Sequence, residues 1–231
     1  MNDKLLWFNP NIQYMFHGNI MEYDMVAMSV SISERFKLLD PETIKILKLL
    51  PKEKRTVKVG LIQRDNKEFS NQLISCELAI RQKFLEINGL DESNVLSLHS
   101  DACIFNSHKE IVNIVDGIEF KHVNTWSSYM NYNGTEMFYD NGIITYKGIP
   151  KDMLNRHTLG IHKYLCNVFN KIDNYDSEIL RYLSKFQTLY LQDKLQDFYY
   201  LPFGTNGEYK MHNLSLFAFV TKAILNDMKG W

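Results

Sequence analysis

The strongest constraint on the fold is a long amphipathic segment between residues 65 and 88. Apolar side chains recur there every three or four residues, which is the spacing of one face of an α-helix. They are Phe69, Leu73, Cys76, Ile80, Phe84 and Ile87. Asp65 is placed to cap the helix, and Asn88-Gly89 is placed to end it. The segment therefore predicts one long helix, which we expect to cover a face of a sheet.

The segments before this helix predict further strands and helices. The expected elements are a buried strand over residues 19–28, short helices over 33–39 and 41–50, a charged turn over 52–55 and a strand over 56–62. The helix from residue 41 has the clearest start, because Asp40 is a good N-cap and Pro41 suits the first helical position.

The pattern changes to short strands between residues 95 and 149. Turn signals divide this stretch and are typical of an antiparallel meander; they are Asn106-Ser107, Asp116-Gly117, Asn133-Gly134 and Asp140-Asn141-Gly142. After Pro150 the pattern is helical, over residues 150–171, 176–196 (with Asp176 as cap) and 214–228. The predicted class is α+β, an antiparallel sheet with helices on one face. We expect a core with an N-terminal arm over residues 1–149 and a helical C-terminal part over 150–231.

Composition limits the function classes. The 231 residues have a net charge of −1, which argues against a strongly basic nucleic-acid binder. Three scattered cysteines without C-x-x-C spacing indicate free thiols in a reducing compartment. We find no signal-peptide pattern and no apolar run long enough to span a membrane. We therefore expect a cytoplasmic protein. Abundant Asn, Lys, Ile and Tyr suit an AT-rich genome, and if the protein is viral we expect it in the host cytoplasm.

Two aspartates are the leading candidates for chemistry. Asp24 closes the apolar run from Asn19, and Asp101 lies in the apolar hairpin from Val95 to Phe105. Two carboxylates that meet across adjacent strands can hold divalent metal ions for phosphoryl transfer. The alternative is that Asp24 is a cap or turn residue and Asp101 a hairpin-turn residue, both common roles for Asp.

These segments resemble the palm of family B DNA polymerases. Asp24-Met-Val-Ala-Met-Ser-Val-Ser31-Ile32 is similar to the first catalytic motif, and His99-Ser-Asp101-Ala-Cys-Ile104 is similar to the Asp-Thr-Asp hairpin. Tyr146-Lys147-Gly148-Ile149 resembles the Lys-Gly segment that follows the palm. The resemblance implies a palm-like sheet in which Asp24 and Asp101 hold Mg²⁺ or Mn²⁺.

The chain also departs from that family. His99 stands where the first Asp of the Asp-Thr-Asp pair is expected, and Ser29-Val30 replaces a Tyr-Pro. No fingers-helix motif and no exonuclease segment is recognisable. Since a bulky ring at the position of Ser29 excludes ribonucleotides in such polymerases, the resemblance implies tolerance of ribonucleotides here.

Substrate groups are expected to come from other segments. Arg64 and Lys67, near the predicted start of the long helix, are candidates for the triphosphate, with Lys52, Lys54 and Arg55 nearby. Lys147, Trp126 and Tyr129 are candidates for a single-stranded nucleic acid, although aromatic residues on strands are more often core. The aromatic segment from Tyr190 to Phe203 is a candidate for docking a protein partner.

Three functions remain open at this level. The first is a compact palm-type nucleotidyltransferase that acts on nucleotides and nucleic acid. The second is a non-catalytic, palm-derived nucleic-acid-binding or replication-accessory protein, and the third is an oligomeric structural or interaction protein. A zinc site is not expected, because His157 and His162 are five residues apart and the helical zinc pair requires four.

Overall fold

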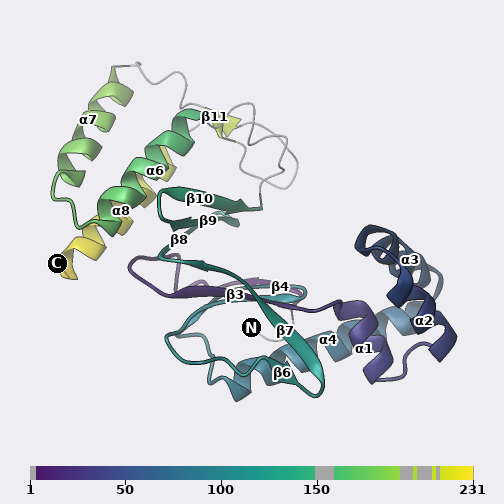
Figure 1. Ribbon diagram of the computed structural model, residues 1–231. Coiled ribbons are helices and arrows are strands. Elements are labelled where there is room, and N and C mark those ends of the chain that lie inside the picture. The colour runs from purple at the N-terminus through teal and green to yellow at the C-terminus, as the bar shows by residue number, and fades with distance from the viewer. Residues whose placement is uncertain (1–3, 149–158, 193–199, 202–209, 212–213, 231) are drawn as a thin grey trace. The chain divides into compact units, whose positions relative to one another are not determined.

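The computed structural model describes residues 4–148, 159–192, 200–201, 210–211 and 214–230, and it divides the chain into two units. The first unit comprises residues 1–11 and 21–124, and the second comprises residues 12–20 and 125–231. Each unit has its own hydrophobic core. The fold class is α+β, as the sequence predicts (Figure 1).

A six-stranded sheet forms the centre of the first unit. Its strands in spatial order are β1 (Leu6–Phe8), β4 (Val95–His99), β5 (Ala102–Asn106), β3 (Ile20–Met25), β7 (Ile118–Trp126) and β6 (Ile114–Val115). The hairpin β4–β5 is antiparallel, and β1 pairs antiparallel with β4 at the sheet edge. The strand that carries Asp24, β3, therefore lies between β5 and β7.

The long helix α4 (Lys67–Ile87) covers one face of this sheet (Figure 1). Phe84 is fully buried, and its ring lies 4.0 Å from that of Phe120 on β7, centroid to centroid. The same ring lies 6.2 Å from Phe105 on β5 and 5.9 Å from Tyr23 on β3. The apolar stripe predicts this packing correctly, because a helix with one apolar face is stable only when another element covers that face. Gly89, with φ of 62°, follows the last turn as expected.

Three shorter helices precede α4, namely α1 (Met28–Arg35), α2 (Pro41–Leu49) and α3 (Lys52–Asp65). The predicted start of α2 is confirmed, since Asp40 accepts a hydrogen bond from the Thr43 N–H at 2.9 Å. The first helix begins earlier than the predicted residue 33, because Ala27 turns the chain directly after β3. The cap of α4 is Asn66, whose side chain accepts from the Phe69 N–H at 3.0 Å, so the prediction of Asp65 as cap is wrong by one residue.

The predicted charged turn and strand over residues 52–62 are also wrong, because this stretch is the helix α3. Alternation of Val57, Val59 and Leu61 suggested a half-buried strand. In the structure only Val59 is buried, while Val57 is 64% and Leu61 41% exposed. A helix satisfies its own backbone hydrogen bonds, so a segment that buries so little side-chain surface is better accommodated as a helix than as a strand.

A four-stranded sheet begins the second unit. Its spatial order is β10 (Ile143–Lys147), β9 (Thr135–Asp140), β8 (Ser128–Tyr132) and β2 (Tyr14–Met15). The turns at Asn133-Gly134 and Asn141-Gly142 have positive φ at both residues, as the sequence predicts for tight hairpins. The helices that follow are α6 (Leu159–Asp173), α7 (Ile179–Leu191) and α8 (Leu214–Asp227), with the 3₁₀ turn Met228–Gly230. A short pair, β11 (Tyr200–Leu201) and β12 (Lys210–Met211), completes the described elements.

The strands β8–β10 share a core with the C-terminal helices. Tyr139 on β9 stacks on Phe169 of α6 with ring centroids 5.3 Å apart, and Met130 and Val220 are buried in the same cluster. The two units therefore divide near residue 124, not at the expected boundary of 149. The apolar side chains of these strands pack against the later helices. The strands therefore belong to the same unit as those helices.

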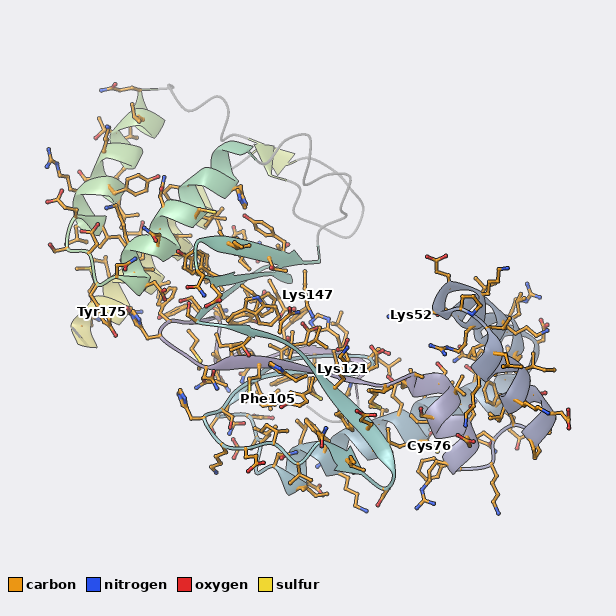
Figure 2. All side chains as sticks on the ribbon, viewed as in Figure 1. Lys52, Cys76, Phe105, Lys121, Lys147 and Tyr175 are labelled. Atoms are coloured by element: carbon orange, nitrogen blue, oxygen red, sulfur yellow. The ribbon has the colours of Figure 1, made fainter. Side chains whose placement is uncertain are left out.

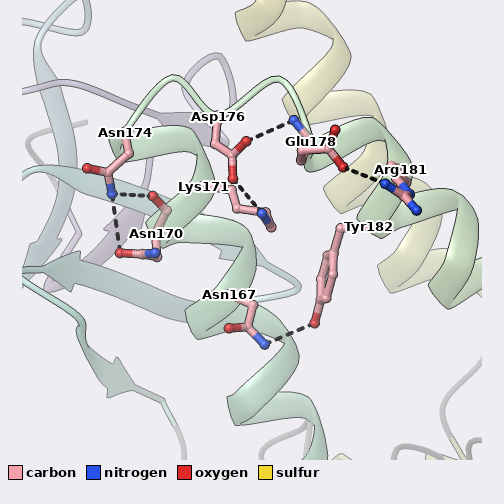
Figure 3. A network of polar contacts seen from close by, with 8 residues as sticks. All are labelled: Asn167, Asn170, Lys171, Asn174, Asp176, Glu178, Arg181 and Tyr182. Carbon is pink, nitrogen blue, oxygen red and sulfur yellow. Dashed lines mark hydrogen bonds and ion pairs between the residues drawn. The ribbon is translucent and has the colours of Figure 1, made fainter.

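The connection from α6 to α7 is held by a polar network (Figure 3). Asp176 accepts from the Glu178 N–H at 2.9 Å and forms an ion pair with Lys171. These contacts, with that to Lys171 the largest, lower the pKa of the Asp176 carboxyl. Asp176 therefore stabilises the turn before α7, but the helix begins at Ile179, so the prediction of Asp176 as its cap is wrong by two residues. Among the described helices, none combines the length and the apolar character that crossing a membrane requires.

Candidate functional site

Asp24 and Asp101 come together at one end of the first sheet. Asp24 is the fifth residue of β3, and Asp101 follows Ser100 in the turn between β4 and β5. The Met25 N–H donates to the Asp101 carbonyl oxygen at 2.9 Å, so the two segments are direct neighbours. The strand that carries Asp24 and the hairpin that carries Asp101 are therefore neighbours, which is the arrangement that a shared metal site requires.

Both aspartates line one cleft with a volume of about 470 Å³. Side chains from four elements and a turn surround it; the polar ones used below are Asp24, Asp101, Ser29, Lys52, Arg55 and Lys121. Lys52 lies at the start of α3 and Lys121 on β7 (Figure 2). Three cations thus share a cleft with two carboxylates, an arrangement that suits a ligand with both metal ions and phosphate groups.

Asp24 and Asp101 both affect the pKa of the buried thiol of Cys103. Cys103 on β5 is fully buried, and burial raises the pKa of its thiol to about 12. The negative charges of Asp24 and Asp101 add to this rise, while the positive charge of Arg81 opposes it. The carboxylates of Asp24 and Asp101 therefore both act on the same buried thiol.

Unusual backbone conformations flank both aspartates. Ala27 has φ of 48° and ψ of 42°, and this left-handed residue turns the end of β3 into α1. Ser100, immediately before Asp101, has φ of 20°. A non-glycine residue with such a conformation costs on the order of 1 kcal/mol, and residues of this kind gather at functional sites.

Oxygen ligands are available for a hard divalent cation. Mg²⁺ keeps several of its waters and often takes only one or two carboxylates from the protein, so Asp24 and Asp101 fit its requirements. Throughout the described ranges, no group of three or more His, Cys, Asp and Glu side chains is arranged to hold a metal ion. The donor set is thus limited to two carboxylates and neighbouring backbone carbonyls.

The predicted phosphate ligands Arg64 and Lys67 do not line this cleft. Arg64 lies in the last turn of α3 and pairs with Asp65 at 2.9 Å, and Lys67 begins α4. The nine residues from Arg55 to Arg64 span about 14 Å of helix. Because residues 52–62 are helical, the start of α3 provides the cations of the cleft, and these are Lys52 and Arg55. Lys121 was not a sequence candidate, and its only signal is a cation in the alternating strand β7.

Trp126 and Tyr129 are core residues, so the predicted stacking platform is wrong for them. Trp126 is 5% exposed and stacks on Phe138 with centroids 4.3 Å apart. Tyr129 is fully buried, and its hydroxyl donates to Glu136 at 3.0 Å. Lys147 lies with its Nζ 6.0 Å from the centroid of Phe138. All of these residues belong to the second unit, whereas the cleft belongs to the first.

The histidine candidates have ordinary packing partners. His99 contacts the ring of Phe8 edge-on and lies 3.3 Å from the Ser97 hydroxyl, and it is not among the described residues that line the cleft. His162 contacts the Tyr146 hydroxyl at 3.1 Å. His157, and most of the aromatic segment from Tyr190 to Phe203, lie outside the described residues.

The fold and the cleft define an α+β protein with one cleft that is lined by two aspartates, two lysines and an arginine. The chain belongs to the family of the Bacteriophage PBS1 gene 130 protein, whose family model matches residues 1–231. It is therefore a member of a phage protein family. No curated protein and no solved structure matches the chain.

Proposed function

We propose that this protein is a compact palm-type nucleotidyltransferase that acts in the cytoplasm of the host cell. The observation that carries the proposal is that Asp24, near the end of β3, and Asp101, in the turn between β4 and β5, line one cleft, and that the Met25 N–H donates to the Asp101 carbonyl oxygen. The strand order supports it as well, because β3 adjoins the hairpin that carries the second acid. Both features match the palm resemblance of the sequence.

In this proposal each group in the cleft has a distinct role. Asp24 and Asp101 would hold Mg²⁺ or Mn²⁺, which supplies charge neutralisation and an activated hydroxyl when bound. Lys52, Arg55 and Lys121 orient and neutralise the phosphate groups of the nucleotide. Phosphoryl transfer depends mainly on the positioning of the reactants and on electrostatic stabilisation. A small cleft with these charged side chains therefore contains the groups that the reaction needs.

Nucleotide incorporation tests the proposal. Purified protein is given labelled NTPs or dNTPs, Mg²⁺ or Mn²⁺, and primed or unprimed single strands of DNA and RNA. We expect Asp24→Asn and Asp101→Asn to lower the rate at least about 100-fold, because each removes a metal-binding charge. Asp65→Asn is the matched control, since Asp65 is an exposed carboxylate that the described contacts place outside the cleft. Wild-type activity in either cleft variant would refute the proposal.

A specific observation also favours a non-catalytic, nucleic-acid-binding accessory protein. Residues 41–67 contain eight basic and three acidic side chains, a local charge of +5 in a chain of net charge −1. This region includes α2 and α3 and offers a local basic surface for a phosphate backbone. Salt-sensitive binding of single strands, weakened by Lys54→Ala and Lys58→Ala and without nucleotide incorporation under any condition, would support this second function.

A further inference from the structure

Two charged side chains are buried on the face of α4 that packs against the sheet. Glu77 is 3% exposed and Arg81 is 1% exposed, and both lie in the stripe that includes Leu73, Ile80 and Phe84. Burying charged groups is costly unless each finds hydrogen-bond partners. Their position therefore requires a structural or functional reason.

Both side chains bind the residue that precedes Asp101. The Ser100 hydroxyl donates to Glu77 Oε1 at 2.8 Å, and Arg81 Nη1 donates to the Ser100 carbonyl oxygen at 3.0 Å. Ser100 is also the residue with φ of 20°. Two separate bonds thus hold an unusual backbone conformation next to a cleft aspartate.

Arg81 joins a second segment to the same place. Its guanidinium donates to the Leu5 carbonyl oxygen at 3.3 Å and also to the Lys4 carbonyl oxygen. These residues lead into β1, where Leu6 is paired with His99 at the end of β4. One side chain therefore fixes the end of β4 both through the turn and through its neighbouring strand.

Glu77 and Asp101 are also linked electrostatically. Burial raises the pKa of Glu77, whereas the hydrogen bond from Ser100 and the charge of Arg81 lower it. The negative charge of Asp101 raises it further. Glu77 is thus close enough to respond to the carboxylate that lines the cleft.

We propose that Glu77 and Arg81 are positioning residues that hold Ser100, and through it Asp101, in the geometry that metal binding and phosphoryl transfer require. This inference rests on the proposed function. Neither residue lines the cleft, so each acts through the turn between β4 and β5. Groups that orient a metal ligand in this way typically contribute about 10- to 100-fold to metal affinity or activity.

The mildest test is Ser100→Ala, which deletes one hydroxyl and leaves the Arg81 bonds to backbone carbonyls in place. Glu77→Ala removes the acceptor, and Glu77→Gln restores an oxygen acceptor without the charge. Glu86→Gln, on the exposed face of the same helix, is the matched control. Amide hydrogen exchange at residues 99–102 is measured by mass spectrometry in each variant.

We expect exchange at residues 99–102 to become at least about fivefold faster in Ser100→Ala and Glu77→Ala, partly restored in Glu77→Gln and unchanged in Glu86→Gln. We also expect kcat for nucleotide incorporation to fall about 10- to 100-fold in Ser100→Ala and Glu77→Ala. The KM for the nucleotide should change little, because Lys52, Arg55 and Lys121 remain. This split between kcat and KM separates positioning from general loss of structure.

Each contrary result has a distinct meaning. Unchanged exchange at residues 99–102 would refute the contact's role in holding the turn. Faster exchange with unchanged kcat would refute the positioning role while leaving the proposed function intact. Absence of incorporation by the wild-type protein would refute the proposed function, and the exchange result would still decide whether the contact between Glu77 and Ser100 holds the turn.

Discussion

Ser29 shows how a single residue in the cleft affects what the site accepts. It is the second residue of α1, it lines the cleft with Asp24, and its backbone carbonyl accepts from the Ser33 hydroxyl at 2.6 Å. Its small side chain leaves space that a tyrosine would fill. The side chain at position 29 therefore does not block the cleft.

We predict that the wild-type protein uses NTPs at least as well as dNTPs, because Ser29 presents no ring to a 2′-hydroxyl. Ser29→Tyr should lower the ratio of kcat/KM for NTP over dNTP by about 10-fold or more, since a clash with one hydroxyl is worth at least 1.4 kcal/mol. Incorporation assays with matched NTP and dNTP pairs measure this ratio. A strong dNTP preference in the wild-type protein would contradict the prediction.

Cys103 makes a separate prediction about pH. The pKa of its thiol is about 12 in the folded protein and 9.0 in the unfolded chain. Above pH 9 the unfolded chain releases this proton while the folded protein keeps it, so the free energy of unfolding falls as pH rises from 9 to 12. At pH 10.5 this amounts to about 2 kcal/mol.

Urea unfolding of the wild-type protein and of Cys103→Ala at pH 8 and pH 10.5 measures the effect. The tyrosines contribute equally to both proteins, so the wild-type protein should lose about 1–2 kcal/mol more than the variant over this interval. Equal losses would show that Cys103 titrates in the folded protein as it does in the unfolded chain.

The residues of the site could be predicted only in part. Asp24, Asp101 and Ser29 could be predicted because each lies in a short apolar segment that resembles a palm motif. Glu77 and Arg81 stand out in the sequence as two charges four residues apart within an apolar helical stripe. The place of Lys52 and Arg55 in the cleft depends on α3 being a helix, and the sequence predicts a turn and a strand there.

The secondary-structure elements depend on partners as much as on local sequence. The long helix α4 was predictable because its stripe extends over five turns. The helix α3 was not, since its three alternating apolar residues match a strand and its only buried residue is Val59. Because so little of its side-chain surface is buried, this segment is a helix on account of its internal backbone hydrogen bonds, and the alternation of its apolar residues does not indicate this.

Gly148 provides a test at the level of strands. It follows β10 with φ of 84°, and a Cβ at this position would lie 2.7 Å from the Gly134 carbonyl oxygen in the turn between β8 and β9. We predict that Gly148→Ala lowers the free energy of unfolding by about 2–3 kcal/mol, because backbone strain and a backbone clash add.

Gly142→Ala is the matched control for Gly148→Ala. Gly142 has the same φ of 84°, but a Cβ there meets no atom within 4 Å. Gly142→Ala should therefore lower the free energy of unfolding by only about 1 kcal/mol, which is the cost of a positive φ for a residue with a Cβ. Equal losses in the two variants, measured by urea unfolding, would show that the approach to Gly134 has no energetic effect.

At the scale of the whole molecule, the chain alternates between its two units. Residues 12–20 join the second unit although the segments on either side of them join the first. Sequence composition shows no boundary at residue 124, since strands continue across it, and the apparent change from strands to helices near residue 149 is not where the units divide. The contacts of β8–β10 with the later helices set the division, and only the structure shows them.

The first unit contains every group of the proposed site, so the proposal depends on this unit alone. Asp24, Asp101, Lys52, Arg55 and Lys121 all lie within residues 21–124. The proposed activity requires that Asp24 and Asp101 hold metal ions together.

The most direct test is anomalous X-ray diffraction from crystals grown with MnCl₂ and a non-hydrolysable nucleoside triphosphate. We predict a Mn²⁺ peak within about 2.0–2.4 Å of carboxylate oxygens of both Asp24 and Asp101, and its loss in crystals of Asp24→Asn. The account would be contradicted if these crystals showed no Mn²⁺ at the two carboxylates and the nucleotide was bound elsewhere or not at all.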